Sequence, residues 1–147
     1  MLARRELSEA QVRERLVRRG HLPEDIDRAI ARLKSERAID DVRVAEAIAR
    51  TEVTLHRRGR RRVNSRIQSA GVAPATARHA VDEIYGEVDA EALLAAALDK
   101  RLHGREGVTD QKEFHRLYRY LLGQGFESDK VLALLRRRSK SSMEDGA

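Results

Sequence analysis

Residues 8–33 read SEAQVRERLVRRGHLPEDIDRAIARL, and this segment decides the fold because it has the pattern of two short helices joined by a glycine. Ser8 and Gln11 have the spacing of a capping box, which satisfies free amides at the start of a helix. Gly20 is suited to end that helix, and Pro23 suits the first turn of the next. Apolar residues recur at spacings of three and four: Val12, Leu16, Ile26, Ala29, Ile30 and Leu33. The segment predicts a pair of amphipathic helices closed by a glycine.

The same arrangement returns twice farther along the chain, centred on Gly71 and on Gly125. Pro74 keeps the place of the first proline, whereas the third copy has Ser128 there, a residue that caps helices well. Apolar residues stand at matching offsets: Val63, Ile67, Ala77, Ala80, Val81 and Ile84 in the second copy, and Leu117, Leu121, Val131, Leu134 and Leu135 in the third. A repeat of this kind indicates stacked helical units.

Each copy has room for one more helix, because the glycines lie roughly fifty residues apart, too far for two short helices alone. Aspartates suited to begin a helix mark the two candidates, at Asp40-Asp41 and at Asp89. Apolar stripes follow them: Val44, Ile48 and Leu55 after the first, and Leu94, Ala97, Leu98 and Leu102 after the second. Only residues 1–7 precede Ser8, so we expect the first copy to lack most of its leading helix.

We therefore expect an all-α protein, an elongated and curved tandem array of three-helix repeats whose first repeat is truncated at its N-terminus. The expected divisions are residues 1–39 for repeat 1, 40–88 for repeat 2 and 89–138 for repeat 3. Residues 139–147 lack an apolar stripe and are expected to form a disordered tail. Strands are not expected, because no long run of β-branched or aromatic residues alternates with polar ones.

The composition narrows the classes of function. Charged residues make up 37% of the chain and aromatic residues 3%, which favours thin amphipathic helices over a core with a deep ligand pocket. The net charge of +6, carried mostly by arginine, favours a polyanionic partner such as nucleic acid. The absence of cysteine excludes disulfides, thiolate metal sites and cysteine nucleophiles. Because no apolar signal region or membrane-spanning stretch is apparent, we expect a cytoplasmic protein.

Three stretches of the sequence resemble the RecX family of regulatory proteins. They are residues 2–8, LARRELS; residues 39–45, IDDVRVA; and residues 58–63, RGRRRV, leading to Ala70, Gly71 and Val72. The Asp-Asp-x-Arg-x-Ala motif, followed by a Gly-basic-Arg-Val stretch, is a fairly specific pairing, and the similarity covers about residues 2–138. The chain departs from the family pattern in its short start and at Val44, where the family commonly has an aromatic residue.

The resemblance implies tandem three-helix repeats, which agrees with the periodicity. It also implies that the protein binds the RecA recombinase, lodges in the groove of its nucleoprotein filament, and restrains filament extension, ATP hydrolysis, strand exchange and co-protease activity. These roles belong to DNA repair, DNA recombination and the SOS response. Neither the periodicity nor the charge of the sequence points to RecA by itself. No cofactor is expected, and an elongated monomer would fit a filament groove most easily.

The densest basic cluster is expected to bind DNA phosphates or acidic side chains of RecA. It straddles Gly59 and consists of Arg57, Arg58, Arg60, Arg61, Arg62 and Arg66. Clustered like charges repel one another, and this repulsion costs stability unless an anion or carboxylates neutralise them. A solvated helix end would account for one or two of these arginines but poorly for five.

Two smaller groups of charged residues are weaker candidates for a binding site. Arg136, Arg137, Arg138 and Lys140 form a secondary basic patch at the end of the last helix, where the helix dipole favours cations in any case. Asp40, Asp41 and Arg43 are expected to mark the junction between repeats 1 and 2, with helix capping as the main role and an inter-helix ion pair as another.

We do not expect an enzyme. The five histidines lack the spacing of a metal site, and no glycine-rich phosphate loop follows a strand. Asp40 and Asp41 point in different directions at a helix start, which is unsuited to paired-carboxylate chemistry. Phe114, Leu117, Tyr118 and Leu121 are expected in a core stripe rather than as a platform for stacking bases.

A second function remains open, namely a non-specific or helix-turn-helix DNA-binding protein that acts independently of RecA. Each glycine-closed helix pair has the outline of that motif. The second helices begin with acidic or small residues, at 23–25, 74–76 and 128–129, and lack the arginine, asparagine or glutamine that reads base edges. Non-specific DNA binding is compatible with either function.

Overall fold

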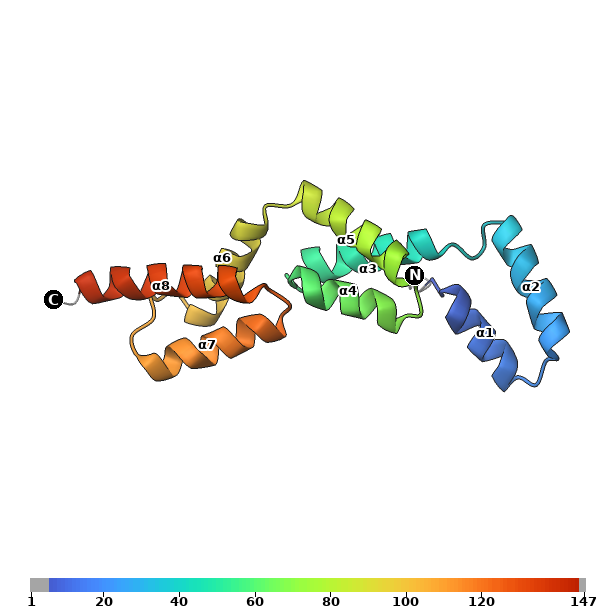
Figure 1. The fold of residues 1–147 in the computed structure, drawn as a ribbon, viewed down its shortest axis with the longest axis horizontal. Coiled ribbons are helices and arrows are strands. Elements are labelled where there is room, and N and C mark those ends of the chain that lie inside the picture. Colours follow the sequence, from blue (N-terminus) through green and yellow to red (C-terminus); the bar gives the residue numbers. More distant parts are fainter. Residues whose placement is uncertain (1–5, 146–147) are drawn as a thin grey trace. The chain divides into compact units, whose positions relative to one another are not determined.

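The structure, a computed structural model, describes residues 6–145, with side chains described as far as residue 139. Helices account for most of this part of the chain and no strand occurs in it, which confirms the predicted all-α fold. In order, as labelled in Figure 1, they are α1 (Glu9–Arg18), α2 (Pro23–Ser35), α3 (Asp41–Thr54), α4 (Arg60–Ser69), α5 (Pro74–Glu87), α6 (Ala90–Leu102), α7 (Gln111–Gly123) and α8 (Ser128–Asp145).

Several helices begin where a side chain satisfies a free backbone amide. The hydroxyl of Ser8 accepts a hydrogen bond from the N–H of Gln11 at 3.2 Å, and the Gln11 side chain accepts one from the N–H of Ser8 at 3.0 Å. This pair confirms the predicted capping box of α1. Asp89 caps α6 by accepting from the N–H of Ala92 at 3.1 Å. The starts of these helices therefore follow from local sequence.

The predicted helix-closing glycines lie at the turns between paired helices. Gly71, between α4 and α5, has a φ of 89°, and Gly125, between α7 and α8, has a φ of 100°. These are backbone conformations that residues with a Cβ atom rarely adopt. Gly71 also lies close to α1, because a Cβ added there would stand 2.5 Å from the Cβ of Ala10. The first turn of α1 therefore packs directly on the α4–α5 turn.

The chain divides into two compact units, which we describe separately. Unit 1 comprises residues 1–51 and 64–84, and unit 2 comprises residues 52–63 and 85–147. These boundaries fall inside α3, α4 and α5 and do not coincide with the expected limits of the three repeats. The division into repeats therefore stays a prediction.

Apolar stripes from several helices form the core of each unit. In unit 1 the buried side chains include Ile26, Ile30, Val44, Ala45, Ala49, Ile67, Ala77 and Val81. In unit 2 one cluster joins α6, α7 and α8 through Leu94, Leu98, Leu102, Val108, Leu117, Leu121, Val131 and Leu135. Partly buried Phe114 and Tyr118 pack against this cluster, where the sequence placed them. Most residues of the predicted stripes are thus in the core.

Two local expectations are wrong. The sequence predicts Leu55 in the buried stripe that follows Asp40-Asp41, but Leu55 is 74% exposed, because α3 ends at Thr54 and the chain turns away at Arg57, which has a positive φ of 51°. Residues 139–145 continue α8 instead of belonging to a disordered tail. The hydroxyl of Ser139 donates to the carbonyl of Leu135 at 2.7 Å, as serine does inside helices. The last two residues of the expected tail lie outside the described residues.

Candidate functional site

The predicted arginine cluster lies at the turn between α3 and α4 and in the first turns of α4. All of its members except Arg66 belong to unit 2. Arg66 lies farther along α4, in the part of that helix that belongs to unit 1. We therefore treat the five arginines between positions 57 and 62 as one candidate site, called the α3–α4 arginine turn.

The backbone of this turn is held by the turn between α7 and α8. The N–H of Gly59 donates to the carbonyl of Gln124 at 2.7 Å, and the N–H of Arg61 donates to the carbonyl of Gly125 at 3.0 Å. Amides at the start of a helix lack partners within the helix itself. Here the neighbouring turn supplies them, so these two amides are not free to bind an anion.

Two glycines make this contact possible. A Cβ added at Gly59 would lie 2.3 Å from the carbonyl carbon of Gly125, and one added at Gly125 would lie 2.4 Å from the backbone nitrogen of Arg62. Neither distance is compatible with a real side chain. The arginine turn is therefore fixed by a direct backbone-to-backbone contact, which gives its side chains a rigid base.

Two of the five arginines are engaged within the protein. The side chain of Arg58 is 21% exposed, and its guanidinium donates to the side chain of Gln124 and lies 3.7 Å from a carboxylate oxygen of Glu52. Arg62 donates from its guanidinium to the carbonyl of Gly123 at 3.0 Å. These contacts hold the turn against α3 and α7. The main role of these two side chains is therefore structural.

Arg60 is placed beside an aromatic ring. Its guanidinium carbon lies 5.6 Å from the centre of the Tyr85 ring, within the range of a cation–π contact. The hydroxyl of Tyr85 donates to the backbone carbonyl of Arg58 at 2.5 Å. Burial raises the pKa of Tyr85 to about 12, although the positive charge of Arg60 acts in the opposite direction. Tyr85 therefore stays protonated and helps to hold the turn.

The remaining two arginines, Arg57 and Arg61, are exposed. Neither has an ion-pair partner in the part of the chain that the structure describes. An exposed guanidinium without an ion-pair partner breaks no contact within the protein when it binds an external anion. Because its backbone is already rigid, binding also costs little backbone entropy. Within the predicted cluster, these two side chains are the ones best placed for an external partner.

The secondary basic patch at the end of α8 is also only partly free. Arg138 forms an ion pair with Asp99 of α6, with 2.7 Å between the nearest atoms, and only 26% of its side chain is exposed. Arg136 and Arg137 are exposed. The side chain of Lys140 lies outside the described residues. Arg138 thus joins α8 to α6, which leaves two arginines of this patch for binding.

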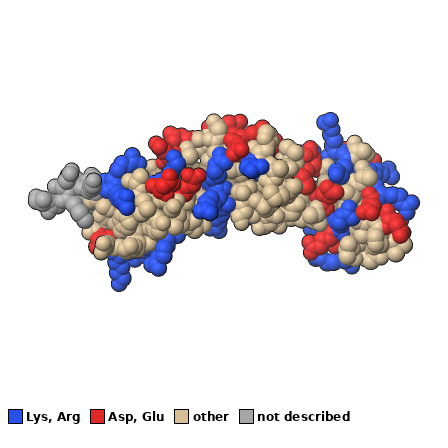
Figure 2. Space-filling view, viewed as in Figure 1, with Lys and Arg blue, Asp and Glu red and all other residues tan. Residues whose placement is uncertain are grey.

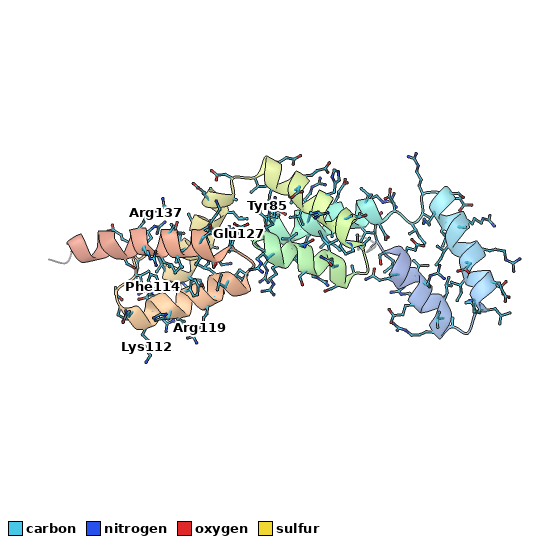
Figure 3. The ribbon with its side chains drawn as sticks, in the orientation of Figure 1. Tyr85, Lys112, Phe114, Arg119, Glu127 and Arg137 are labelled. Atoms are coloured by element: carbon cyan, nitrogen blue, oxygen red, sulfur yellow. The ribbon has the colours of Figure 1, made fainter. Side chains whose placement is uncertain are left out.

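A third basic surface lies on α7 and is not among the surfaces predicted from the sequence. Four exposed side chains share one face of this helix at spacings of three and four residues: Lys112, His115, Arg116 and Arg119. Figure 2 shows lysine and arginine side chains along the outer edge of α7, and Figure 3 shows Lys112 and Arg119 pointing away from α8. We call this surface the α7 stripe, and its spacing could have been found by placing the charged residues on a helix.

The cations of the α7 stripe are not neutralised by ion pairs within the described part of the chain. Among the described residues, no carboxylate forms an ion pair with Lys112, Arg116 or Arg119. The guanidinium of Arg101 in α6 lies over the ring of partly buried Tyr120, with 4.1 Å from the guanidinium carbon to the ring centre. A stack of this kind presents a cation beside an aromatic surface, a combination found where proteins bind single strands of nucleic acid.

The predicted junction residues connect the start of α3 to the start of α1 within unit 1. Asp40 accepts from the N–H of Val42 at 3.0 Å and so caps α3. Asp41 accepts from the N–H of Glu9 at 2.9 Å. Arg43 forms an ion pair with Glu6, with 2.5 Å between the nearest atoms. These contacts are structural, and the two aspartates do not converge on a shared ligand.

One carboxylate is buried in unit 2. Burial alone would raise the pKa of Glu113, but hydrogen bonds from Arg105 and Thr109 lower it below its usual value. Arg105 lies 2.6 Å from the carboxylate, so this charge is balanced locally. In the described part of the chain, no group of three or more His, Asp or Glu side chains is placed to hold a metal ion. No helix there is long and apolar enough to cross a membrane.

Comparisons with known proteins give a consistent result. Residues 1–33 match the family model described as the first three-helix domain of RecX. The chain is 32% identical to the regulatory protein RecX of Chromohalobacter salexigens, over 89% of this chain and 83% of the relative. It is 30% identical to the regulatory protein RecX of Halorhodospira halophila, over 90% of this chain and 80% of the relative.

The fold has a counterpart among solved structures. The crystal structure of RecX from Lactobacillus salivarius aligns with a TM-score of 0.71 over 89% of this chain and 84% of that protein. The sequence identity in this alignment is 19%, so it supports the fold only.

Proposed function

This chain belongs to the RecX family of regulatory proteins, and we propose on that basis that it binds RecA and its nucleoprotein filament. By binding there it inhibits filament extension, ATP hydrolysis and strand exchange in DNA repair, recombination and the SOS response. The observation that carries this proposal is the 32% identity to a regulatory protein RecX over most of both chains. As a regulator, the protein acts by binding in the cytoplasm as a monomer, without chemistry of its own.

We further propose that two basic surfaces of unit 2 contact DNA without sequence preference. The exposed Arg57 and Arg61 on the arginine turn supply one, and the α7 stripe supplies the other. Each unpaired cation that contacts a phosphate releases counterions from the DNA, which favours binding and makes it sensitive to salt. Arg58 and Arg62 act mainly by holding the turn in place.

The alternative, a helix-turn-helix protein that reads a DNA sequence, has less support. The second helices of the glycine-closed pairs are α2, α5 and α8. Their first turns contain Glu24 and Asp25, Ala75 and Thr76, and Asp129. Acidic side chains at these positions repel phosphates, and small ones do not reach base edges. A marked preference for one duplex sequence would favour this alternative.

The test is the ATPase activity of RecA on single-stranded DNA in the presence of the purified protein. The native chain should slow hydrolysis at near-stoichiometric amounts. The double variant Arg57→Ala/Arg61→Ala should require several-fold more protein for the same inhibition, because it removes two exposed cations without touching the backbone contact of the turn.

A matched control is Arg13→Ala/Arg28→Ala, which removes the same charge from unit 1. These two arginines already form ion pairs with Asp27 and Asp25. The control should inhibit RecA as the native chain does. If the native chain leaves ATP hydrolysis unchanged at every ratio, the proposed function is wrong and a general DNA-binding protein is the better account.

A further inference from the structure

Unit 2 contains a groove between α6 and α8 that the proposed DNA contacts do not use. Its volume is about 690 Å³, and Arg60 and Tyr85 are among the residues that line it. The buried side chains of Leu94, Phe126 and Leu134 line it, and alanines of both helices add to the lining: Ala92, Ala95 and Ala133. Small side chains let another backbone come close, so the groove suits a segment of polypeptide.

The charges along the groove do not suit DNA. Four carboxylates line it, those of Asp89, Glu91, Glu127 and Asp129. Asp89 caps α6, whereas the other three form no ion pair with any described residue. Unpaired carboxylates repel phosphates, and the cations of the lining do not outnumber them. The groove is thus chemically distinct from the α7 stripe.

These charges are unevenly placed along α8. Glu127 and Asp129 stand at its start, with Lys130 next to them, so carboxylates outnumber cations there. Arg137 stands farther along the same helix, as Figure 3 shows for Glu127 and Arg137. At 1.5 Å per residue, the ten positions from Glu127 to Arg137 span roughly 15 Å, about three turns of a helix. An occupant with a cation at the first end and a carboxylate at the second would pair with both.

We propose that the α6–α8 groove binds a short amphipathic helical segment of the protein partner. The segment places small aliphatic side chains against the alanines of the lining, a lysine or arginine near Glu127, and an aspartate or glutamate near Arg137. This inference rests on the proposed function, since the partner is then RecA. It assigns protein recognition and DNA contact to separate surfaces of one unit.

Two single variants separate the surfaces. Ala133→Trp fills the groove from an exposed position without changing charge, and Glu127→Lys reverses the charge at one end. Both should need about tenfold more protein to inhibit the RecA ATPase, a loss typical of a disrupted contact at the centre of an interface. Glu127→Lys makes the protein more basic, so its affinity for a labelled single-stranded oligonucleotide, measured by fluorescence anisotropy, should be unchanged or higher.

The control for the bulky substitution is Ala47→Trp, at an exposed position of α3 in unit 1, which should behave as the native chain does. Melting temperatures of all variants report whether they fold. The inference is overturned if both groove variants inhibit RecA as well as the native chain, or if inhibition and DNA affinity fall together. If the native chain itself does not inhibit the RecA ATPase, the proposed function is wrong, and that result is distinct from a failure of the groove variants alone.

Discussion

Gly59 and Gly125 lie so close together that neither position has room for a Cβ atom. Gly125 also has a φ of 100°, which disfavours any residue other than glycine. Gly125→Ala should therefore reduce the free energy of unfolding by about 3 kcal/mol, the sum of backbone strain and steric overlap. Urea denaturation followed by circular dichroism measures this loss.

Gly20 provides the control, because it has a φ of 84° but no neighbour within 4 Å of an added Cβ. Gly20→Ala should cost only the backbone strain, about 1 kcal/mol. Equal losses for the two substitutions would show that the contact between the arginine turn and the α7–α8 turn contributes nothing to stability.

Tyr85 gives a residue-scale prediction that depends on pH. Burial raises its pKa from 10.0 in the unfolded chain to about 12 in the folded protein. Its contribution to stability is therefore complete below pH 10 and is lost as the pH rises toward 12, because the unfolded chain ionises first. The unfolding free energy of the native chain should fall across this range more steeply than that of Tyr85→Phe.

Since the two proteins differ only in this hydroxyl group, the difference between their unfolding free energies is the quantity to measure, by urea denaturation at several pH values. At pH 8 the phenylalanine variant should already be less stable by about 1 kcal/mol, because it lacks the hydrogen bond to the carbonyl of Arg58. Parallel pH profiles for the two proteins would contradict the raised pKa.

At the scale of helices, each unit has a hydrogen bond from the start of one helix to the turn that joins the next pair of helices. The hydroxyl of Ser8, just before α1, donates to the carbonyl of Ala70, and the amide of Gly59, just before α4, donates to the carbonyl of Gln124. Ser8 and Gly59 stand at the same number of residues before the closing glycine of their helix pairs, and each acceptor directly precedes the glycine of the next pair. The internal repeat thus includes a repeated hydrogen bond between a helix start and a glycine turn, which we call the joint.

Ser8→Ala tests this joint in unit 1. Ser8 is fully buried, and its hydroxyl both caps α1 and donates to Ala70, so the substitution should cost about 2 kcal/mol of unfolding free energy. Asp89→Ala removes a cap of the same kind from exposed Asp89, which has no second hydrogen-bond partner among the described residues, and should cost about 1 kcal/mol. Thermal unfolding of both variants gives the comparison, and a cost for Ser8→Ala no larger than for Asp89→Ala would mean that the bond to Ala70 is unimportant.

The helices could be predicted from sequence because their causes are local. Capping residues such as Ser8 and Asp89, and apolar residues at spacings of three and four, act within one or two turns. The joint itself could not be predicted, because no residue near Gly59 in the sequence indicates that its amide donates to the carbonyl of Gln124. For the same reason the arginine cluster was found by its density, whereas the engagement of Arg58 and Arg62 within the protein depends on partners far away in the sequence.

At the scale of the whole molecule, the chain has a net charge of +6, and its cations differ between the two units in how often they form ion pairs. In unit 1 many cations have a carboxylate partner, as in the pairs Arg13–Asp27, Arg18–Glu14, Arg28–Asp25, Arg32–Glu36 and Arg43–Glu6. In unit 2 the α7 stripe and the exposed arginines of the turn have none among the described residues. Cations that are already paired release fewer counterions on binding DNA, so we expect unit 2 to dominate DNA affinity.

The decisive comparison is between two triple variants that remove the same charge. Lys112→Ala/Arg116→Ala/Arg119→Ala removes the unpaired cations of the α7 stripe, and Arg18→Ala/Arg28→Ala/Arg32→Ala removes paired cations from unit 1. A plot of the logarithm of the binding constant for single-stranded DNA against the logarithm of salt concentration should become less steep by about 2 for the first variant. The slope for the second should stay close to that of the native chain. Equal changes in both would mean that DNA affinity follows net charge alone, and that the α7 stripe is an ordinary hydrated helix surface.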